Sequence, residues 1–316
     1  MGRVIIIGLV VILLIVGTGW LILRVLPQAQ PETQDSITSQ VSENEDLWVE
    51  QEVAVAGKYA DADVVDLGDG RFRMYYAIEP EVSGNQLEVY SALSADGITW
   101  TPEAGVRRTL STFPDVMKLP DNTWRMYFQN SGVIKSAIST DGLKWTDEAG
   151  TRVDAVNTLG LALESVGAST TILVSDGTYL MVYRGTINSS YNSQVPNKTQ
   201  GVLLIATSAD GLEWEKKGFA LDTRTNVFEG WADGPEWINR DDGSLGLYFW
   251  GYKGIYESAY SNTFGSPELI YRGPNVDQKV MYSPNPPGDP TLAKIGSAWM
   301  MYYGQHEKGI YRATLK

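Results

Sequence analysis

Short runs of apolar and aromatic residues alternate with Gly, Asp and Asn through most of this 316-residue chain. Within residues 61–100, four such runs have the length and composition of short β-strands, at residues 64–65, 72–76, 87–93 and 98–100. The pairs Asp69-Gly70 and Asp96-Gly97 stand between runs, and such pairs tolerate the positive φ angles of tight hairpin turns. The pattern therefore predicts a four-stranded antiparallel meander of roughly 45 residues.

The meander is repeated along the chain. The second strand of each copy carries a large apolar residue at a matching position, at intervals of roughly 52 to 66 residues. These positions are Met74, Met126, Met181, Leu247 and Met301. A single meander cannot bury both faces of its sheet, so the copies must pack against one another, and a closed ring leaves few exposed sheet edges. We therefore predict an all-β fold, a five-bladed β-propeller, over residues 47–316.

The fifth repeat reaches the end of the chain at Lys316 without a fourth strand of its own. The segment 47–53, at the start of the repeats, has the composition of a strand. We expect this segment to supply the missing outer strand of the last blade, which would close the ring by joining its two ends.

The beginning of the chain has a different pattern. Residues 4–23 form a nearly continuous apolar run, and about 20 helical residues span ~30 Å, the hydrocarbon thickness of a bilayer. No well-formed cleavage site comes after this run, so residues 1–26 are predicted to be an uncleaved, single-pass transmembrane helix that anchors the protein. A cleaved signal peptide is the alternative. Anchors of this form commonly export the rest of their chain, so we expect the propeller on the extracytoplasmic side of the membrane.

Composition adds a linker and several exclusions. Residues 27–46 are rich in Gln, Ser, Thr and Glu, which predicts a flexible linker. A net charge of −13 argues against nucleic acid as a partner. The absence of cysteine excludes disulfides, thiolate zinc sites and cysteine nucleophiles. His306 is the single histidine and has no adjacent ligand cluster, so neither a metal site nor a cofactor is predicted.

Three repeats share the motif Ser-x-Asp-Gly-x-x-Trp, at residues 94–100, 139–145 and 208–214. It is one residue shorter than the Asp-box of sialidases, which it resembles. Turn chemistry explains its residues, because the Asp caps a turn and the Trp packs between blades. We interpret the motif as structural and not as a sign of sialidase activity.

The first strand of each blade lines the axis of a propeller. When the repeats are aligned on the second strand, the opening positions of these first strands are Asp61, Phe113, Ala168, Asp233 and Asp289. The axial positions, two residues later, are Asp63, Asp115, Thr170, Pro235 (with Glu236 beside it) and Thr291. Residues i and i+2 share a face of a strand, so carboxylates from several blades should converge at one mouth. Crowded carboxylates repel and one tends to keep its proton, which suits general acid and base catalysis.

Simpler roles remain open for the same residues. An aspartate at the start of a strand often accepts hydrogen bonds from nearby backbone N–H groups, and for any single residue we favour that structural role. For the carboxylates as a group, a structural role and a chemical role are equally supported. Trp231 and Trp237 lie close to the fourth-blade carboxylates in sequence, where they could stack on sugar rings or pack between blades.

The repeats resemble the five-bladed propellers of the furanosidase superfamily, which includes glycoside hydrolase families 43, 32 and 68. The similarity lies in the first-blade aspartate and hairpin of residues 61–76 and in Asp289-Pro290-Thr291. It also lies in Asp233-Gly234-Pro235-Glu236-Trp237, which is similar to the motif that holds the general acid of that superfamily.

The resemblance implies roles for individual residues. Asp61 would be the base or nucleophile, Asp115 would tune the acid, and Asp233 or Glu236 would be the acid, with Glu164 as a competitor. The expected substrate contacts are Asp63, Asp289, Trp231 and Trp237.

Together these observations predict a membrane-tethered, extracytoplasmic propeller that resembles glycoside hydrolases and acts on carbohydrate by paired-carboxylate acid and base chemistry. Two alternatives remain, a propeller that binds glycans without cleaving them and a protein-interaction propeller at the cell surface.

Overall fold

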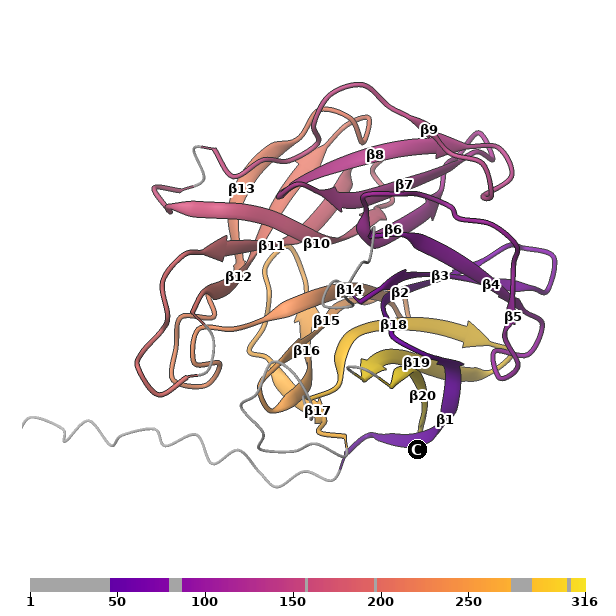
Figure 1. Ribbon diagram of the computed structural model, residues 1–316. Coiled ribbons are helices and arrows are strands. Elements are labelled where there is room, and N and C mark those ends of the chain that lie inside the picture. The colour runs from indigo at the N-terminus through magenta and orange to yellow at the C-terminus, as the bar shows by residue number, and fades with distance from the viewer. Residues whose placement is uncertain (1–45, 80–86, 157–158, 196–197, 274–285, 306–307) are drawn as a thin grey trace, which may run out of the picture. The chain divides into compact units, whose positions relative to one another are not determined.

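The computed structural model describes residues 46–79, 87–156, 159–195, 198–273, 286–305 and 308–316. In these ranges the chain forms twenty β-strands, arranged as five four-stranded antiparallel sheets. The sheets are the blades of a propeller, and the first strands of neighbouring blades contact one another around a central axis (Figure 1). The predicted all-β, five-bladed fold is therefore confirmed.

The first three blades follow one another along the chain, each with its first strand innermost. Blade 1 consists of β2 (Tyr59–Asp66), β3 (Phe72–Ile78), β4 (Val89–Ser94) and β5 (Thr101–Pro102). Blade 2 consists of β6 (Thr112–Lys118), β7 (Trp124–Asn130), β8 (Val133–Ser139) and β9 (Thr146–Asp147). Blade 3 consists of β10 (Leu163–Leu173), β11 (Tyr179–Ile187), β12 (Gln200–Ser208) and β13 (Glu215–Leu221).

The last two blades complete the ring. Blade 4 consists of β14 (Asp233–Asn239), β15 (Leu245–Gly251), β16 (Gly254–Tyr260) and β17 (Glu268–Tyr271). Blade 5 consists of β18 (Gly288–Ile295), β19 (Ala298–Gln305), β20 (Gly309–Leu315) and, from the start of the domain, β1 (Trp48–Ala56).

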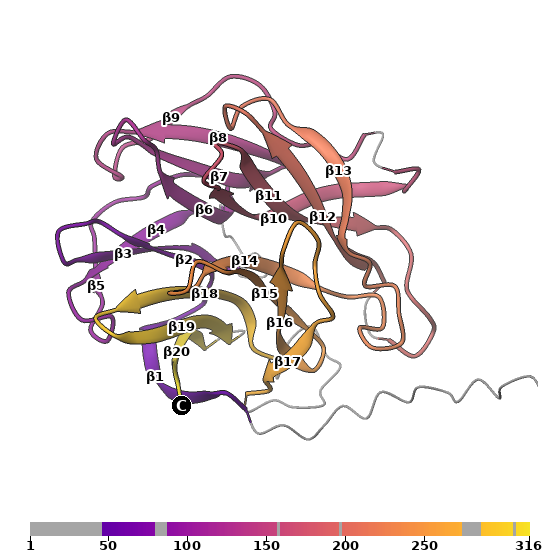
Figure 2. The ribbon, with the colours of Figure 1, turned by 180° about the vertical axis from the view of Figure 1, so that it is seen from behind.

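The ring closes as predicted. β1 pairs antiparallel with β20 in a register that sets Trp48 opposite Leu315 and Ala56 opposite Gly309. The two strands lie side by side in both views of the molecule (Figures 1 and 2). This pairing satisfies the edge of β20 that would otherwise be left open.

The core lies between the blades. The five residues that revealed the repeat are all fully buried, with no exposed surface at Met74, Met126, Met181, Leu247 or Met301. Side chains alternate across a strand, so one face of each second strand packs against each neighbouring blade. The repeat in the sequence is therefore a repeat of core positions.

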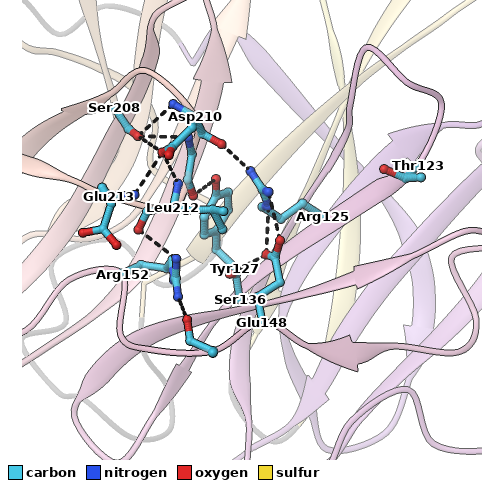
Figure 3. A network of polar contacts seen from close by, with 12 residues as sticks. Thr123, Arg125, Tyr127, Ser136, Glu148, Arg152, Ser208, Asp210, Leu212 and Glu213 are labelled. Carbon is cyan, nitrogen blue, oxygen red and sulfur yellow. Dashed lines mark hydrogen bonds and ion pairs between the residues drawn. The ribbon is translucent and has the colours of Figure 1, made fainter.

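The Ser-x-Asp-Gly-x-x-Trp motif is a turn that fastens one blade to the next (Figure 3). In blade 3, Oδ1 of Asp210 accepts hydrogen bonds from the backbone N–H groups of Leu212 and Glu213, at 2.8 and 3.0 Å. The hydroxyl of Tyr127, on β7 of blade 2, donates to the carbonyl of Gly211 at 2.9 Å. The same tyrosine-to-glycine bond joins blades 1 and 2 and blades 5 and 1. The motif is therefore structural, as the sequence indicated.

The predicted anchor at residues 1–26 and almost all of the predicted linker at residues 27–46 lie outside the described residues. Asp46 is described, and its carboxylate accepts a hydrogen bond from the backbone N–H of Arg272 at 3.0 Å. In the described part of the chain, no helix is long and apolar enough to cross a membrane.

Candidate functional site

The first strand of every blade begins with the same backbone irregularity. One residue in each strand has a φ angle between 45° and 53°, in the left-handed region, and a β-bulge interrupts the pairing with the second strand at that point. These opening residues are Asp61, Phe113, Ala168, Gly234 and Asp289. The bulge sets which side chains of each strand reach the axis.

In the fourth blade this result corrects the sequence alignment by one residue. The opening residue is Gly234 rather than Asp233, and the axial residue is Glu236 rather than Pro235. Only glycine fits at the opening position of this strand, because a Cβ atom on Gly234 would lie 2.7 Å from the Cα atom of Asp289. Real Cβ atoms do not approach backbone this closely. Asp233 therefore lies one position before the opening residue.

A small pocket, with a volume of about 30 Å³, opens at this end of the axis. Five carboxylates from four blades line it: Asp61, Asp63, Asp115, Glu236 and Asp289. The third blade contributes Ala168 and Ser169 instead. The structure therefore brings together most of the carboxylates that the sequence placed at the axis, and leaves Asp233 out of the lining.

Glu236 is held by two threonine hydroxyls from neighbouring blades. Thr170 donates to its Oε2 atom at 3.1 Å, and Thr291 donates to its Oε1 atom at 3.0 Å. Each hydroxyl in turn accepts a backbone N–H, from Trp237 at 3.1 Å and from Val64 at 3.2 Å. Both oxygens of Glu236 thus accept a hydrogen bond, which fixes the orientation of the carboxylate.

Asp63 and Asp115 also link successive blades. The backbone N–H of Val116 donates to Oδ2 of Asp63 at 2.7 Å, and the hydroxyl of Thr171 donates to Oδ2 of Asp115 at 2.7 Å. Oδ2 of Asp61 accepts the backbone N–H of Phe113 at 3.2 Å. The structural role that aspartates have at strand starts is therefore present, and it coexists with their convergence on the pocket.

Burial and mutual repulsion change the acidity of this cluster. Burial raises the pKa of Asp63 to about 7. Burial and the charge of Asp63 raise the pKa of Asp115 well above its ordinary value. Burial, followed by the charges of Asp63 and Asp115, raises the pKa of Glu236 in the same way. Crowded charges oppose one another in a poorly solvated site, so the protonated forms of this cluster are favoured.

A second group of charges consists of Asp61 and Asp289 in the pocket lining and of Arg184 and Asp233, which do not line the pocket. Burial and the charge of Asp289 raise the pKa of Asp61 well above its ordinary value, against the opposing charge of Arg184. The indole N–H of Trp250 donates to Oδ1 of Asp289 at 2.9 Å. Arg184, on β11, forms a buried ion pair with Asp233. Asp233 therefore neutralises Arg184 and does not line the pocket.

Trp231 and Trp237, the tryptophans expected to contact substrate, do not line the pocket. Trp231 is 4% exposed and packs against Trp250, and Trp237 is 8% exposed and stacks on Phe264. Neither ring lines the pocket, so packing between strands is the role that the structure supports. Glu164, the competing acid, is exposed on β10 and does not line the pocket.

The sequence analysis gave no role to three polar residues of the site, Thr170, Thr291 and Arg184. Thr170 and Thr291 stand at axial positions in the alignment, and that shared position was a signal that they act with the carboxylates. Arg184 gave no such signal, because its partner Asp233 comes from another blade. Within the described residues, no group of three or more carboxylate or histidine side chains is placed to hold a metal ion, and His306 lies outside those residues.

No model of a known protein family matches the sequence, and no curated protein does. Solved structures match at low identity. A glycosyl hydrolase from Bacteroides ovatus is 14% identical, with a TM-score of 0.59, over 82% of this chain and 84% of that chain. A thermostable family 43 glycoside hydrolase is 15% identical, with a TM-score of 0.54, over 84% and 91% of the two chains.

A third match comes from glycoside hydrolase family 130. It is described as a family of mannoside phosphorylases that contains hydrolases targeting β-1,2-mannosidic linkages in Candida mannan. This structure is 13% identical, with a TM-score of 0.63, over 86% of this chain and 94% of that chain. At such identities the likeness concerns the fold. The chain is a five-bladed β-propeller that resembles the glycoside hydrolases of families 43 and 130.

Proposed function

We propose that this propeller cleaves glycosidic bonds by acid and base chemistry between carboxylates of the axial pocket. One observation carries the proposal: carboxylates from separate blades line one pocket, where burial and mutual repulsion raise the pKa values of Asp115 and Glu236. A glycosidase needs one protonated and one ionised carboxyl group on either side of the bond that breaks. The likeness in fold to glycoside hydrolases supports the same conclusion.

The geometry favours particular roles. Glu236 is the proposed general acid in preference to Asp233, because it lines the pocket while Asp233 is paired with Arg184. Asp61, which also lines the pocket, is the proposed base or nucleophile. Asp115 is the proposed tuning carboxylate, because its charge raises the pKa of Glu236 together with burial and the charge of Asp63.

Two further carboxylates line the same pocket. Asp63 and Asp289, which line the pocket, are the proposed acceptors of hydrogen bonds from sugar hydroxyls. Asp63 belongs to the same charged cluster as Glu236 and is therefore the second candidate for the base.

A second candidate function is glycan binding without cleavage. The observation that favours it is that Asp61 and Asp63 already accept backbone hydrogen bonds, and that the pocket is small. In that case the carboxylates would accept hydrogen bonds from sugar hydroxyls and transfer no proton. A protein-interaction platform has less support, because five carboxylates and no basic side chain are among the described residues that line the pocket.

The test is a panel of defined oligosaccharides with product detection by chromatography. Wild-type protein should cleave at least one member, and Asp61→Asn and Glu236→Gln should each lower turnover by several orders of magnitude while the protein still melts cooperatively. Glu164→Gln, an exposed carboxylate outside the pocket, is the matched control and should retain activity. Equal turnover by wild type and Asp61→Asn would eliminate that assignment, and binding without cleavage would favour the second candidate.

We further propose that the propeller is tethered to the outer face of a membrane by residues 1–26. The apolar run of the sequence supports the tether. Extraction that requires detergent is the expected result. Release of a protein that begins near Gln30 would show that the run is a cleaved signal peptide.

A further inference from the structure

Blade 3 gives the pocket no carboxylate, but an arginine on its second strand contacts both neighbouring blades. The side chain of Arg184, on β11, is 10% exposed and does not line the pocket. Its NH2 group donates to Oε1 of Gln129, on β7 of blade 2, at 3.2 Å. A buried guanidinium with several partners has a fixed position, so it also fixes the groups that it contacts.

Toward blade 4, Arg184 holds the opening of the strand that carries Glu236. The guanidinium forms a buried ion pair with Oδ2 of Asp233. The other oxygen of that carboxylate, Oδ1, accepts the backbone N–H of Gly234 at 2.8 Å. Gly234 is the opening residue of β14, and Glu236 stands two residues later on the same strand. The ion pair therefore holds the backbone that places the proposed acid.

Toward blade 2, Arg184 lies against the residue that hydrogen-bonds to Asp61. Its guanidinium carbon lies 5.3 Å from the centre of the Phe113 ring, within the range of a cation–π contact. The backbone N–H of Phe113 donates to Oδ2 of Asp61 at 3.2 Å. Phe113 has a φ angle of 50°, which a bulky residue adopts only where its surroundings hold it. The contact with Arg184 therefore helps to hold the donor that orients the proposed base.

We infer that Arg184 is a positioning residue, which fixes Asp61 and Glu236 relative to each other without lining the pocket. One side chain contacts both neighbouring blades, so its displacement would change the separation of these two carboxylates. A displacement of about 1 Å can lower the rate of a reaction by about 100-fold, because the acid and the base must both reach the same bond. The inference rests on the proposed function in that Asp61 and Glu236 are taken to be the reacting carboxylates.

The charge of Arg184 provides a readout that needs no substrate. Burial raises the pKa of Asp61, the charges of Asp289 and Asp233 raise it further, and the charge of Arg184 lowers it. Loss of Arg184 removes a positive charge and leaves Asp233 unpaired, and both changes raise the pKa of Asp61. Among the described residues, the charged groups around Asp61 are Asp63 on its own strand, Asp115 on β6, Asp233 and Glu236 on β14, Asp289 on β18 and Arg184 on β11.

The kinetic test compares Arg184→Gln with Arg73→Gln. Arg73 is a matched control, since its side chain is 9% exposed, is paired with Glu103 at 2.8 Å and does not line the pocket. Both variants remove one partner of a buried ion pair and should lose stability. Only Arg184→Gln should lower kcat, by about 10- to 100-fold with KM changed less than about threefold, on the oligosaccharide that the wild type cleaves fastest. Arg184→Lys keeps the charge and should recover part of the lost kcat.

The second measurement is an NMR titration of protein labelled with carbon-13 at the aspartate carboxyl groups. The Asp61 signal is identified by its absence in Asp61→Asn. Its midpoint should rise by at least about half a pH unit in Arg184→Gln and stay unchanged in Arg73→Gln. If Arg184→Gln does not fold, Arg184→Lys is compared with Arg73→Lys. Hydrogen exchange at the Phe113 amide should then be at least about tenfold faster in Arg184→Lys alone, because lysine lacks the planar group over the ring.

The two proposals can fail separately. A wild-type kcat and a wild-type Asp61 midpoint in Arg184→Gln would overturn the inference and leave the catalytic proposal standing. An equal loss of kcat in Arg73→Gln would assign that loss to reduced stability and would also overturn the inference. If the wild type cleaves no oligosaccharide, the catalytic proposal falls, and the Asp61 titration decides whether Arg184 acts on this carboxylate.

Discussion

At the scale of single residues, the pKa values of the buried carboxyl groups determine the charge of the site. Asp63 is the clearest case, because burial raises its pKa to about 7 while the unfolded chain leaves it near 4. The folded state therefore favours the protonated form. Stability from this group is complete below about pH 4 and is lost as the pH rises through about 7.

This sign gives a testable prediction for Asp63→Asn. Between about pH 4 and 7, Asp63 should lower the free energy of unfolding by about 1.4 kcal/mol per pH unit. Asparagine has no proton to lose and still accepts the backbone N–H of Val116, so the slope should be smaller in the variant by the contribution of Asp63, while the other buried carboxyl groups keep theirs. Urea unfolding at several pH values measures it, with exposed Glu52→Gln as the control. A slope in Asp63→Asn equal to that of the wild type would show that Asp63 does not hold this proton.

At the scale of elements, the recurring unit is the Ser-x-Asp-Gly-x-x-Trp turn, whose glycine carbonyl accepts a hydrogen bond from a tyrosine of the neighbouring blade. Gly211 has a φ angle of 74°, and a Cβ atom there would lie 2.6 Å from the hydroxyl oxygen of Tyr127. Glycine is thus required twice, by the left-handed backbone and by the approach of the tyrosine. The edge of Trp214 against the same tyrosine, with ring centres 5.8 Å apart, completes the contact.

The variant Gly211→Ala should be less stable than Gly177→Ala. Gly177 lies in another turn of blade 3 and has a φ angle of 87°, but a Cβ atom there would meet nothing within 4 Å. Both variants carry the backbone strain of about 1 kcal/mol, and only Gly211→Ala also displaces Tyr127, at a further cost of about 1 to 2 kcal/mol. Chemical denaturation measures both. Equal losses of unfolding free energy in the two variants would show that the contact between Gly211 and Tyr127 contributes little to stability.

At the scale of the whole molecule, stability depends on closing the ring. β1 supplies the fourth strand of blade 5 from the opposite end of the domain. Trp48, at its start, is 2% exposed and packs edge-on against Tyr248 of blade 4. Closure thus joins three parts of the chain that are distant in sequence.

Removal of β1 should weaken the whole domain. A chain that begins at residue 57 would lose the burial of Trp48 and expose the edge of β20, so it should melt at a lower temperature and self-associate. A chain that begins at residue 46 keeps β1 and is the control. Thermal melting and size-exclusion chromatography compare the two, and matching behaviour would show that closure is dispensable.

The sequence by itself determined the class of fold, the number of blades and the closing strand. These come from local signals, since alternating apolar residues and Asp-Gly turns specify hairpins, and five copies of one hairpin pair must share a core. It also placed the carboxylates of blades 1, 2 and 5 correctly, because those strands align without ambiguity on Met74, Met126 and Met301.

Only the tertiary structure decided the rest of the site. In blade 4 the alignment was uncertain by one residue, and a shift of one residue changes which face a side chain occupies. The close approach of Asp289 to Gly234 settled it, which brought Glu236 to the axis and left Asp233 with Arg184. Whether a tryptophan stacks on a sugar or packs in the core likewise depends on what lies beside it, and that is set by contacts between blades that no local pattern encodes.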